Sequence, residues 1–268
     1  MMGDVATGGH DPVSVRIKTI LGRMIRRPRI WNTKWWQERL YPTEESRNPA
    51  ITFARLVQRQ VKSSDRVLDI GAGAGERNLV SLKGRCREVV GVDMDPRVVI
   101  NPLLDRGVVA DATSTGLEDA SFDLIFALYV LEHIERPDAF AAEMARLLRP
   151  GGRFMFLTPN AYHYVTLLSR LSPERFHKRF NAWRGRAEQD TFPTVYALNS
   201  RRALNRTFHR AGFGKGDFAM VEVQPNYLLW SLPSFMLGAL YERVVNASRL
   251  WEGLRVNVIG TFVRTAHQ

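Results

Sequence analysis

The sequence predicts an α/β protein built around a mostly parallel sheet, and three observations support this prediction. Between about residues 64 and 160, short apolar runs alternate with helical patterns, which is typical of parallel strands joined by right-handed crossovers. The first apolar run leads directly into three alternating glycines, Gly71, Gly73 and Gly75. Further on, a helical pattern meets "RPGG" and then another strand-like run. A chain of 268 residues has room for one such domain with extensions.

The expected strands follow one another along the chain. They read "RVLDIG" (66–71), "EVVGVDM" (88–94), "GVVADAT" (107–113), "FDLIFALYV" (122–130), "GRFMFLTPN" (152–160) and "NVIGTFVRTA" (257–266). The first is almost entirely apolar, as expected of a strand buried on both faces. Before the fifth strand, one helical face carries Phe140, Met144, Leu147 and Leu148. We expect this helix to end at Arg149, because a proline disfavours helical geometry at the residue before it.

Positive charge is concentrated in two segments of the chain. The formal net charge is +11 at pH 7. Seven Lys and Arg residues lie between positions 16 and 34 with no acid among them, and six more lie between 170 and 186. Such segments are either a solvated basic surface or a site for an anionic partner. That partner would be nucleic acid, a phosphate-bearing substrate or an acidic membrane face.

Cysteine content and the N-terminal residues bear on the compartment. Cys86 is the single cysteine, which excludes an intrachain disulfide, and the first residues are polar and rich in glycine. We expect a cytoplasmic protein, with peripheral contact to an anionic membrane at its inner face as an open alternative. We divide the chain into a basic, aromatic N-terminal extension (1–45) and a main domain (46–268). Substrate-side insertions are expected at about 160–195 and 223–253.

The glycine loop indicates which kind of nucleotide the fold holds. A dinucleotide fingerprint needs a third glycine where this chain has Glu76. A carboxylate there suits the start of a helix but discourages a pyrophosphate at the same amides. No G-K-[ST] sequence follows the loop, so the phosphate-binding Walker pattern is absent from the sequence. A nucleoside without phosphate fits better, and S-adenosylmethionine is such a compound.

Three acids at consecutive strand ends support this interpretation. Asp93 ends the second expected strand, where a carboxylate can accept hydrogen bonds from both hydroxyls of a ribose. Asp111 ends the third and is placed to accept from the exocyclic amine of adenine. Asp69 lies in the first motif and could receive the ammonium of the methionine part. Each acid alone could merely end a strand or cap a helix, but ligands of open α/β sheets bind at these strand ends.

Five segments of the chain together resemble the motifs of a known family. The segments "VLDIGAGAGE", "VVGVDMDP", "VVADAT", "FDLIFALYVLEHI" and "LLRPGGRFMFLTPN" are similar to the ordered motifs of class I S-adenosylmethionine-dependent methyltransferases of the type-11 group. The resemblance covers about residues 64–160. It implies a Rossmann-like, seven-stranded, mostly parallel sheet with helices on both faces, an antiparallel last strand and an N-terminal helical extension. It also implies cofactor contacts at Asp69, Gly71, Ala72, Gly73, Gly75, Asp93, Met94, Asp111 and Ala112, with Ala127 and Leu128 near the methyl group.

Candidates for the chemistry follow the fourth and fifth strands. A hydroxyl acceptor must lose a proton, so a general base helps the transfer. His133 is the leading candidate, with Glu132 as its orienting partner or a second acid, and His163 is a further candidate at the same mouth. Either histidine could instead be structural. Quinone O-methyltransferases of similar appearance carry E-x-x-E-H here, but the first position is Tyr129, so we predict no required metal.

The acceptor is predicted only as a class. Residues 227–241 carry no charge, and this segment either packs in the core, forms a dimer contact, roofs a pocket for an apolar acceptor or rests on a membrane. A basic rim beside an apolar lid favours an amphiphilic anionic acceptor, such as a lipid-linked or phosphorylated glycan intermediate. We expect the methyl group to be transferred to a hydroxyl oxygen of a small-molecule, lipid-linked or saccharide acceptor. RNA is disfavoured, because the motif expected of amino-group enzymes is replaced by "ALYVLEH". An RNA methyltransferase and a non-catalytic scaffold of the same fold remain alternatives, and oligomeric state stays open.

Overall fold

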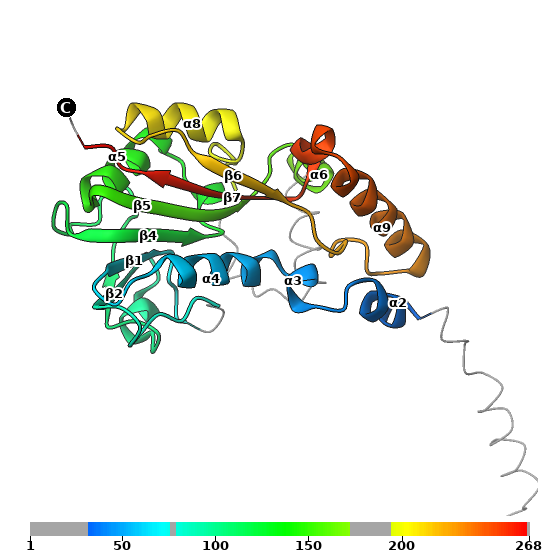
Figure 1. The fold of residues 1–268 in the computed structure, drawn as a ribbon, viewed down its shortest axis with the longest axis horizontal. Coiled ribbons are helices and arrows are strands. Elements are labelled where there is room, and N and C mark those ends of the chain that lie inside the picture. Colours follow the sequence, from blue (N-terminus) through cyan, green and yellow to red (C-terminus); the bar gives the residue numbers. More distant parts are fainter. Residues whose placement is uncertain (1–31, 76–78, 172–193, 267–268) are drawn as a thin grey trace, which may run out of the picture.

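The computed structural model describes residues 32–75, 79–171 and 194–266 (Figure 1). Its centre is a seven-stranded sheet in the order β3-β2-β1-β4-β5-β7-β6. The strands are β1 Arg66–Ile70, β2 Glu88–Asp93, β3 Arg106–Val109, β4 Phe122–Leu128, β5 Leu148–Pro159, β6 Asp217–Val221 and β7 Asn257–Val263. Strands β1 to β5 pair in parallel, whereas β7 is antiparallel to both β5 and β6. The predicted sheet with its antiparallel last strand is confirmed.

Helices cover both faces of this sheet. On one face lie α5 (Pro137–Leu147) and α8 (Arg201–Arg210), and on the other lies α4 (Pro49–Gln60) (Figure 1). The rings of Phe154 and Phe262 stack on Phe208 of α8 at centroid distances of 5.1 and 4.5 Å. On the opposite face α4 buries Phe53 completely. Successive residues of β5 alternate between these two cores, as the two-residue period of a strand requires.

The junction between α5 and β5 differs from the expectation. The helix ends at Leu147, not at Arg149, because Leu148 already has extended geometry and pairs with Phe122 in the sheet. Residues 149–152 then form an irregularity in the ladder, after which Arg153 pairs with Leu124. Tertiary pairing with β4 therefore ends the helix before the proline does.

Strand β6 was not assigned from the sequence. Its five residues, "DFAMV", lie at the edge of the sheet and only Met220 among them is buried. A short, half-exposed edge strand carries little of the apolar pattern by which strands are recognised. The strand nevertheless runs parallel to β5, because both pair antiparallel with β7.

Helices α6 (Tyr164–Leu171) and α9 (Leu232–Ala247) lie beyond the edge of the sheet where β4 and β5 end (Figure 1). Three short 3-10 helices are also described: η2 (Pro96–Ile100), η3 (Leu131–His133) and η5 (Arg249–Leu254). Two further helices, α2 (Thr33–Leu40) and α3 (Glu44–Arg47), precede α4. The first expected insertion contains α6, and the second contains α9 and η5. Most of both basic segments, and Glu76, lie outside the described residues.

Within the described part of the chain, every helix is too short or too polar to cross a lipid bilayer.

Candidate functional site

The loop after β1 has a conformation that glycine adopts readily and other residues do not. Gly71, Gly73 and Gly75 have φ angles of +77°, +52° and +83°. A Cβ atom on Gly71 would lie only 2.4 Å from Cγ2 of Val130, which follows β4. The bare backbone of this loop therefore packs against the end of β4 and can approach a ligand closely.

A buried amide holds the same loop from the other side. Asn101, which is 5% exposed, donates through Nδ2 to the carbonyl oxygens of Ala72 and Gly73 at 3.0 and 3.1 Å. Its Oδ1 would be 2.4 Å from a Cβ on Gly75. Sequence reasoning missed Asn101. The only local signal is the following proline, which marks a turn but does not reveal a contact with residues almost thirty positions earlier.

Asp93 connects the end of β2 to the glycine loop. Its Oδ2 accepts a hydrogen bond from the Gly73 backbone N–H at 2.8 Å, and its Oδ1 accepts from Asp95 N–H at 2.9 Å. An ionised carboxylate has about four acceptor positions, so each oxygen can still accept one further hydrogen bond. The side chain is half-buried. It therefore lies where the sequence placed a ribose-binding acid, fixed in orientation by the backbone.

The remaining predicted cofactor residues lie around the same edge of the sheet. Asp69 is buried within β1, and Met94 is 60% exposed directly after Asp93. Asp111 accepts from Thr113 N–H at 2.7 Å and pairs with Arg136 at 3.2 Å. These hydrogen bonds, the one from Thr113 first, lower the pKa of the Asp111 carboxyl, so it stays ionised. The half-buried residues Ala112 and Leu128 and the buried residues Ala127 and Ala72 complete the predicted set.

The two candidates after β4 lie on η3 and differ in burial. Glu132 is 6% exposed, and its Oε2 accepts a hydrogen bond from Thr158 Oγ1 at 3.1 Å. Thr158 in turn accepts from Asn199 Nδ2 at 2.7 Å. The Glu132 backbone oxygen also accepts from the N–H groups of residues 195 and 196. Glu132 thus ties η3 to β5 and to the chain before α8, while His133 is half-buried beside it.

His163 is brought next to an acid that the sequence did not indicate. Strands β5 and β6 run parallel, so the residues that follow them meet at one edge of the sheet. His163 follows β5, Glu222 follows β6, and Nε2 of His163 lies 3.6 Å from Oε2 of Glu222. His163 is 1% exposed, and its Nδ1 accepts from Val165 N–H at 3.3 Å. The neutral ring therefore carries its proton on Nε2, toward Glu222.

Burial shifts both of these groups toward their neutral forms. It lowers the pKa of His163 to about 4 and raises the pKa of Glu222 to about 8, the latter with a further contribution from the negative charge of Glu242. The N–H of Val256, which donates to Glu222 Oε2 at 2.8 Å, opposes the second shift only in part. At neutral pH the pair is uncharged.

An apolar groove opens beside this pair. It has a volume of about 400 Å³, and its walls come from α6, from α9 and from the turn before α9. Its lining residues are Tyr164, Leu228, Leu237, Gly238, Leu240, Tyr241 and Val244. The centroids of the Tyr164 and Tyr241 rings lie 4.2 and 5.7 Å from that of His163. The two tyrosines therefore stand between the groove and the His163–Glu222 pair.

No three His, Cys, Asp or Glu side chains of the described residues are gathered as a metal site would require.

Comparison with known proteins now identifies the class. Residues 44–215 match a model of the methyltransferase domain, and the chain belongs to that family. Over 112 residues it is 35% identical to the ubiquinone/menaquinone biosynthesis C-methyltransferase UbiE of Burkholderia orbicola (strain MC0-3), covering 38% of this chain and 46% of that protein. The chain thus spans about half the length of the curated relatives it matches.

Solved structures share the fold. An S-adenosylmethionine-dependent methyltransferase from Archaeoglobus fulgidus superposes with a TM-score of 0.54 at 18% identity, covering 85% of this chain and 98% of that one. Phosphoethanolamine N-methyltransferase 2 of Haemonchus contortus, in complex with S-adenosyl-L-methionine, superposes with a TM-score of 0.50 at 17% identity, covering 82% and 53%. These likenesses concern the fold: the chain carries a methyltransferase domain with a Rossmann-like, seven-stranded sheet.

The residues present fit this cofactor. A loop of three glycines at positive φ leaves room for a ligand against bare backbone. Among the atoms of the described residues, a Cβ at Gly73 would have only Asp93 Oδ2 within 4 Å, at 3.9 Å. Asp93 and Asp111 offer carboxylate oxygens, which suit hydroxyl and amine donors and repel phosphate. A nucleoside with a free ribose diol and no phosphate matches this set of acceptors.

Replacing Asn101 by alanine tests the support of the loop. We expect Asn101→Ala to lower the free energy of unfolding by about 1–3 kcal/mol, because two carbonyl oxygens lose their donor. Binding of S-adenosylmethionine, measured by calorimetric titration, should weaken with it. Asn246→Ala is the matched control, since it removes an amide that donates to Glu242 one turn earlier on α9, far from the glycine loop in the sequence. Unchanged binding and stability in Asn101→Ala would show that the loop does not depend on this side chain.

Proposed function

We propose that this methyltransferase acts on a hydroxyl oxygen of a small amphiphilic acceptor, lipid-linked or saccharide-bearing, whose apolar part lies in the groove between α6 and α9. The groove itself is the observation that carries the proposal. It lies at the carboxyl edge of the sheet, and its wall residue Tyr164 begins α6 a few positions after β5 ends. Strand β5 is the neighbour of β4, whose end we assign to the methyl site.

The protein's part in the reaction is mainly alignment. The cofactor supplies a methyl group already activated by its sulfonium. Holding the acceptor in line with that group can contribute about 7 kcal/mol or more. We assign the acceptor's apolar part to the side chains of α9, including Leu237 and Leu240. Water is thereby kept from the apolar side of the site.

We assign the base to His133 and positioning roles to Glu132 and His163. His133 is half-buried on η3, directly beyond β4, and so can meet both a ligand and solvent. Glu132 is engaged by Thr158 and holds η3 in place. His163 has its Nδ1 occupied and its Nε2 directed at Glu222, behind the two tyrosines, so it supports the groove wall.

Replacing His133 by glutamine tests the base. A positioned general base typically contributes about 10²–10⁴-fold to the rate, so we expect His133→Gln to lower kcat by that order. Affinity for S-adenosylmethionine should be unchanged by calorimetric titration. His209→Gln is the control, because His209 is exposed on α8. If turnover by His133→Gln matches the wild type across pH, the acceptor needs no base at this position.

Transfer to carbon is the second candidate, because the curated relatives are named C-methyltransferases. One experiment decides between the two. The protein is incubated with methyl-labelled S-adenosylmethionine and a panel of polyprenyl-linked, saccharide and quinone-precursor acceptors, and the product is examined by NMR. A methoxy signal from an amphiphilic acceptor supports the first proposal, and a C-methyl signal supports the second. Equal activity on neutral water-soluble acceptors, unaffected by Leu240→Ser in the groove, would contradict the assignment of the groove.

A further inference from the structure

We propose that η5 and the cavity beside it bind the surface of an anionic phospholipid bilayer, with a lipid phosphate in the cavity and apolar side chains among the headgroups. We name this the η5 surface. It consists of the exposed side chains Leu250, Trp251 and Leu254 and the cationic cavity side chains Arg201, Lys215, Arg249 and Arg255. The proposal is independent of the acceptor and of the methyl transfer.

The apolar side chains of this surface are strongly exposed to solvent. Leu250 is 90%, Trp251 50% and Leu254 38% exposed, and all three belong to one helix of six residues. The helix is held firmly. Ser248 Oγ accepts from Leu250 N–H at 3.2 Å, and Tyr241 donates its hydroxyl to the Leu254 carbonyl at 2.6 Å. Single exposed leucines are ordinary, but leucine and tryptophan presented together beside cations are typical of interfacial anchors.

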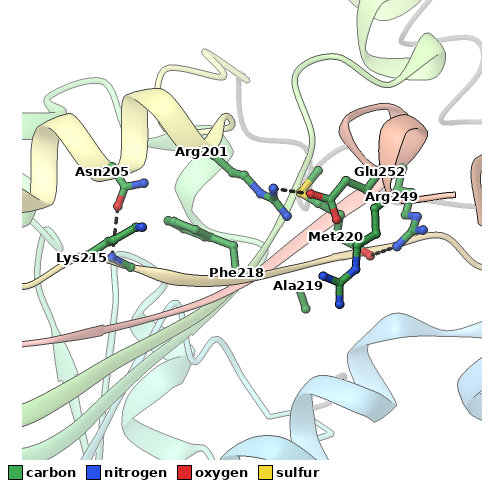
Figure 2. Close-up of a pocket in the computed structure, with 10 residues that line it drawn as sticks. Arg201, Asn205, Lys215, Phe218, Ala219, Met220, Arg249 and Glu252 are labelled. Atoms are coloured by element: carbon green, nitrogen blue, oxygen red, sulfur yellow. Dashed lines mark hydrogen bonds and ion pairs between the residues drawn. The ribbon is translucent and has the colours of Figure 1, made fainter.

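A cationic cavity adjoins these residues. It has a volume of about 650 Å³ and is bounded by α8, the free edge of β6 and η5, as Figure 2 shows. Four cationic side chains line it against a single carboxylate, that of Glu252. Glu252 is already paired with Arg201, at 2.6 Å. The size lies within the range of ordinary ligand pockets, and the charge favours an anion.

The cations differ in what already engages them. Arg255 is oriented by the carbonyl oxygens of Val245 and Met220, at 3.1 and 3.0 Å. The Nε atom of Arg201 is buried and has no hydrogen-bond partner among the described residues. Among the described residues, neither Lys215 nor Arg249 forms an ion pair. Several N–H donors therefore remain for the oxygens of a phosphate group, which guanidinium groups bind in charge-assisted pairs.

The exposed apolar side chains and the cationic cavity together favour a bilayer over a soluble phosphate compound. A soluble ligand would occupy the cavity and leave Leu250 and Trp251 in water. A bilayer surface meets both, because apolar and aromatic side chains enter the headgroup region while lysine and arginine meet anionic lipids.

Vesicle co-sedimentation of the full chain tests this proposal. We expect binding to vesicles of phosphatidylcholine with phosphatidylglycerol, weakening as salt is raised, and at least about tenfold weaker binding to phosphatidylcholine alone. The double variants Leu250→Ser/Trp251→Ser and Lys215→Gln/Arg249→Gln should each weaken binding about tenfold or more. Arg206→Gln is the control, because Arg206 is exposed on α8 outside the cavity. Thermal unfolding of each variant confirms that it is folded.

Other outcomes would overturn the proposal. Equal binding to neutral vesicles, or none to either kind, contradicts an anionic bilayer. Binding of inorganic diphosphate without vesicle binding would assign the cavity to a soluble phosphate compound. Self-association that Leu250→Ser/Trp251→Ser abolishes would assign the apolar residues to a second copy of the chain. If Arg206→Gln weakens binding as much as the cavity variant does, net charge and not the cavity determines it. None of these outcomes bears on methyl transfer.

Discussion

Gly71→Ala is expected to abolish binding of S-adenosylmethionine and to lower the free energy of unfolding by about 2–5 kcal/mol. Two effects add at this position. An alanine would have to keep the φ of +77°, and its Cβ would lie 2.4 Å from Cγ2 of Val130. If the loop avoids the collision by moving away from β4, it displaces the backbone that we expect to contact the cofactor. Denaturant unfolding and calorimetric titration measure the two losses separately.

Gly84 provides a matched control for the collision. It has the same φ of +77°, but a Cβ there would meet no atom of the described residues within 4 Å. Gly84→Ala should therefore cost only about 1 kcal/mol and leave cofactor binding intact. The double variant Gly71→Ala/Val130→Ala removes the colliding methyl group and should recover part of the affinity. If Gly71→Ala and Gly84→Ala behave alike, close packing of the loop against Val130 has no consequence for binding.

Between pH 6.5 and pH 8, the free energy of unfolding is expected to fall by about 2 kcal/mol because of Glu222. In the folded protein the pKa of its carboxyl is about 8, whereas the ordinary value is 4.5. The folded state thus keeps a proton that the unfolded state has lost. The stability from this group is full below pH 4.5 and is lost as the pH rises to about 8.

His163 changes the free energy of unfolding in the opposite direction, and at lower pH. Its pKa falls from 6.5 to about 4 on folding, so its contribution is full above pH 6.5 and is lost as the pH falls toward 4. The two slopes largely offset each other between pH 4.5 and 6.5. The fall above pH 6.5 therefore isolates Glu222, which is 5% exposed in its side chain.

Urea unfolding at several pH values between 6.5 and 8 checks this prediction. Glu222→Gln should give a nearly flat profile over that interval. Glu252→Gln is the control and should retain the fall, because the ion pair with Arg201 lowers the pKa of Glu252 and keeps it ionised throughout. A fall of the same size in Glu222→Gln would mean that another group is responsible.

The sequence predicts the parallel part of the sheet, from β1 to β5, well, because the signals for these strands are local. Residues that contact the glycine loop, such as Asp93, lie at strand ends, and parallel strands bring their carboxyl ends to one edge. The order of the motifs along the chain then predicts the strands from β1 to β5. The last strand, β7, is recognised by its apolar residues. Even here the sequence did not predict the hydrogen bonds of Asn101 to the glycine loop, because they depend on how the chain returns to that loop after η2.

The part of the chain after β5 could not be predicted in the same detail. The His163–Glu222 pair joins residues almost sixty positions apart, through an edge strand whose pattern is too weak to recognise. The groove depends on α6 and α9, whose apolar residues are compatible with a core, a dimer contact or a pocket. Leu148 is likewise part of β5, because it pairs with β4, whereas the local effect of Pro150 alone predicted that the helix would continue through it. Long-range contacts decided each of these cases.

The position of β7 between β5 and β6 has a consequence for synthesis of the chain. Residues 217–221 leave the ribosome before residues 257–263, yet only the later segment connects them to the sheet. Strand β6 therefore has no partner while α9 and η5 are being made. The sheet cannot grow one strand at a time on this side, and we expect the insertion of β7 to limit the rate of folding. Until then Phe154, Phe156 and Phe208 lack the ring of Phe262 that completes their stack.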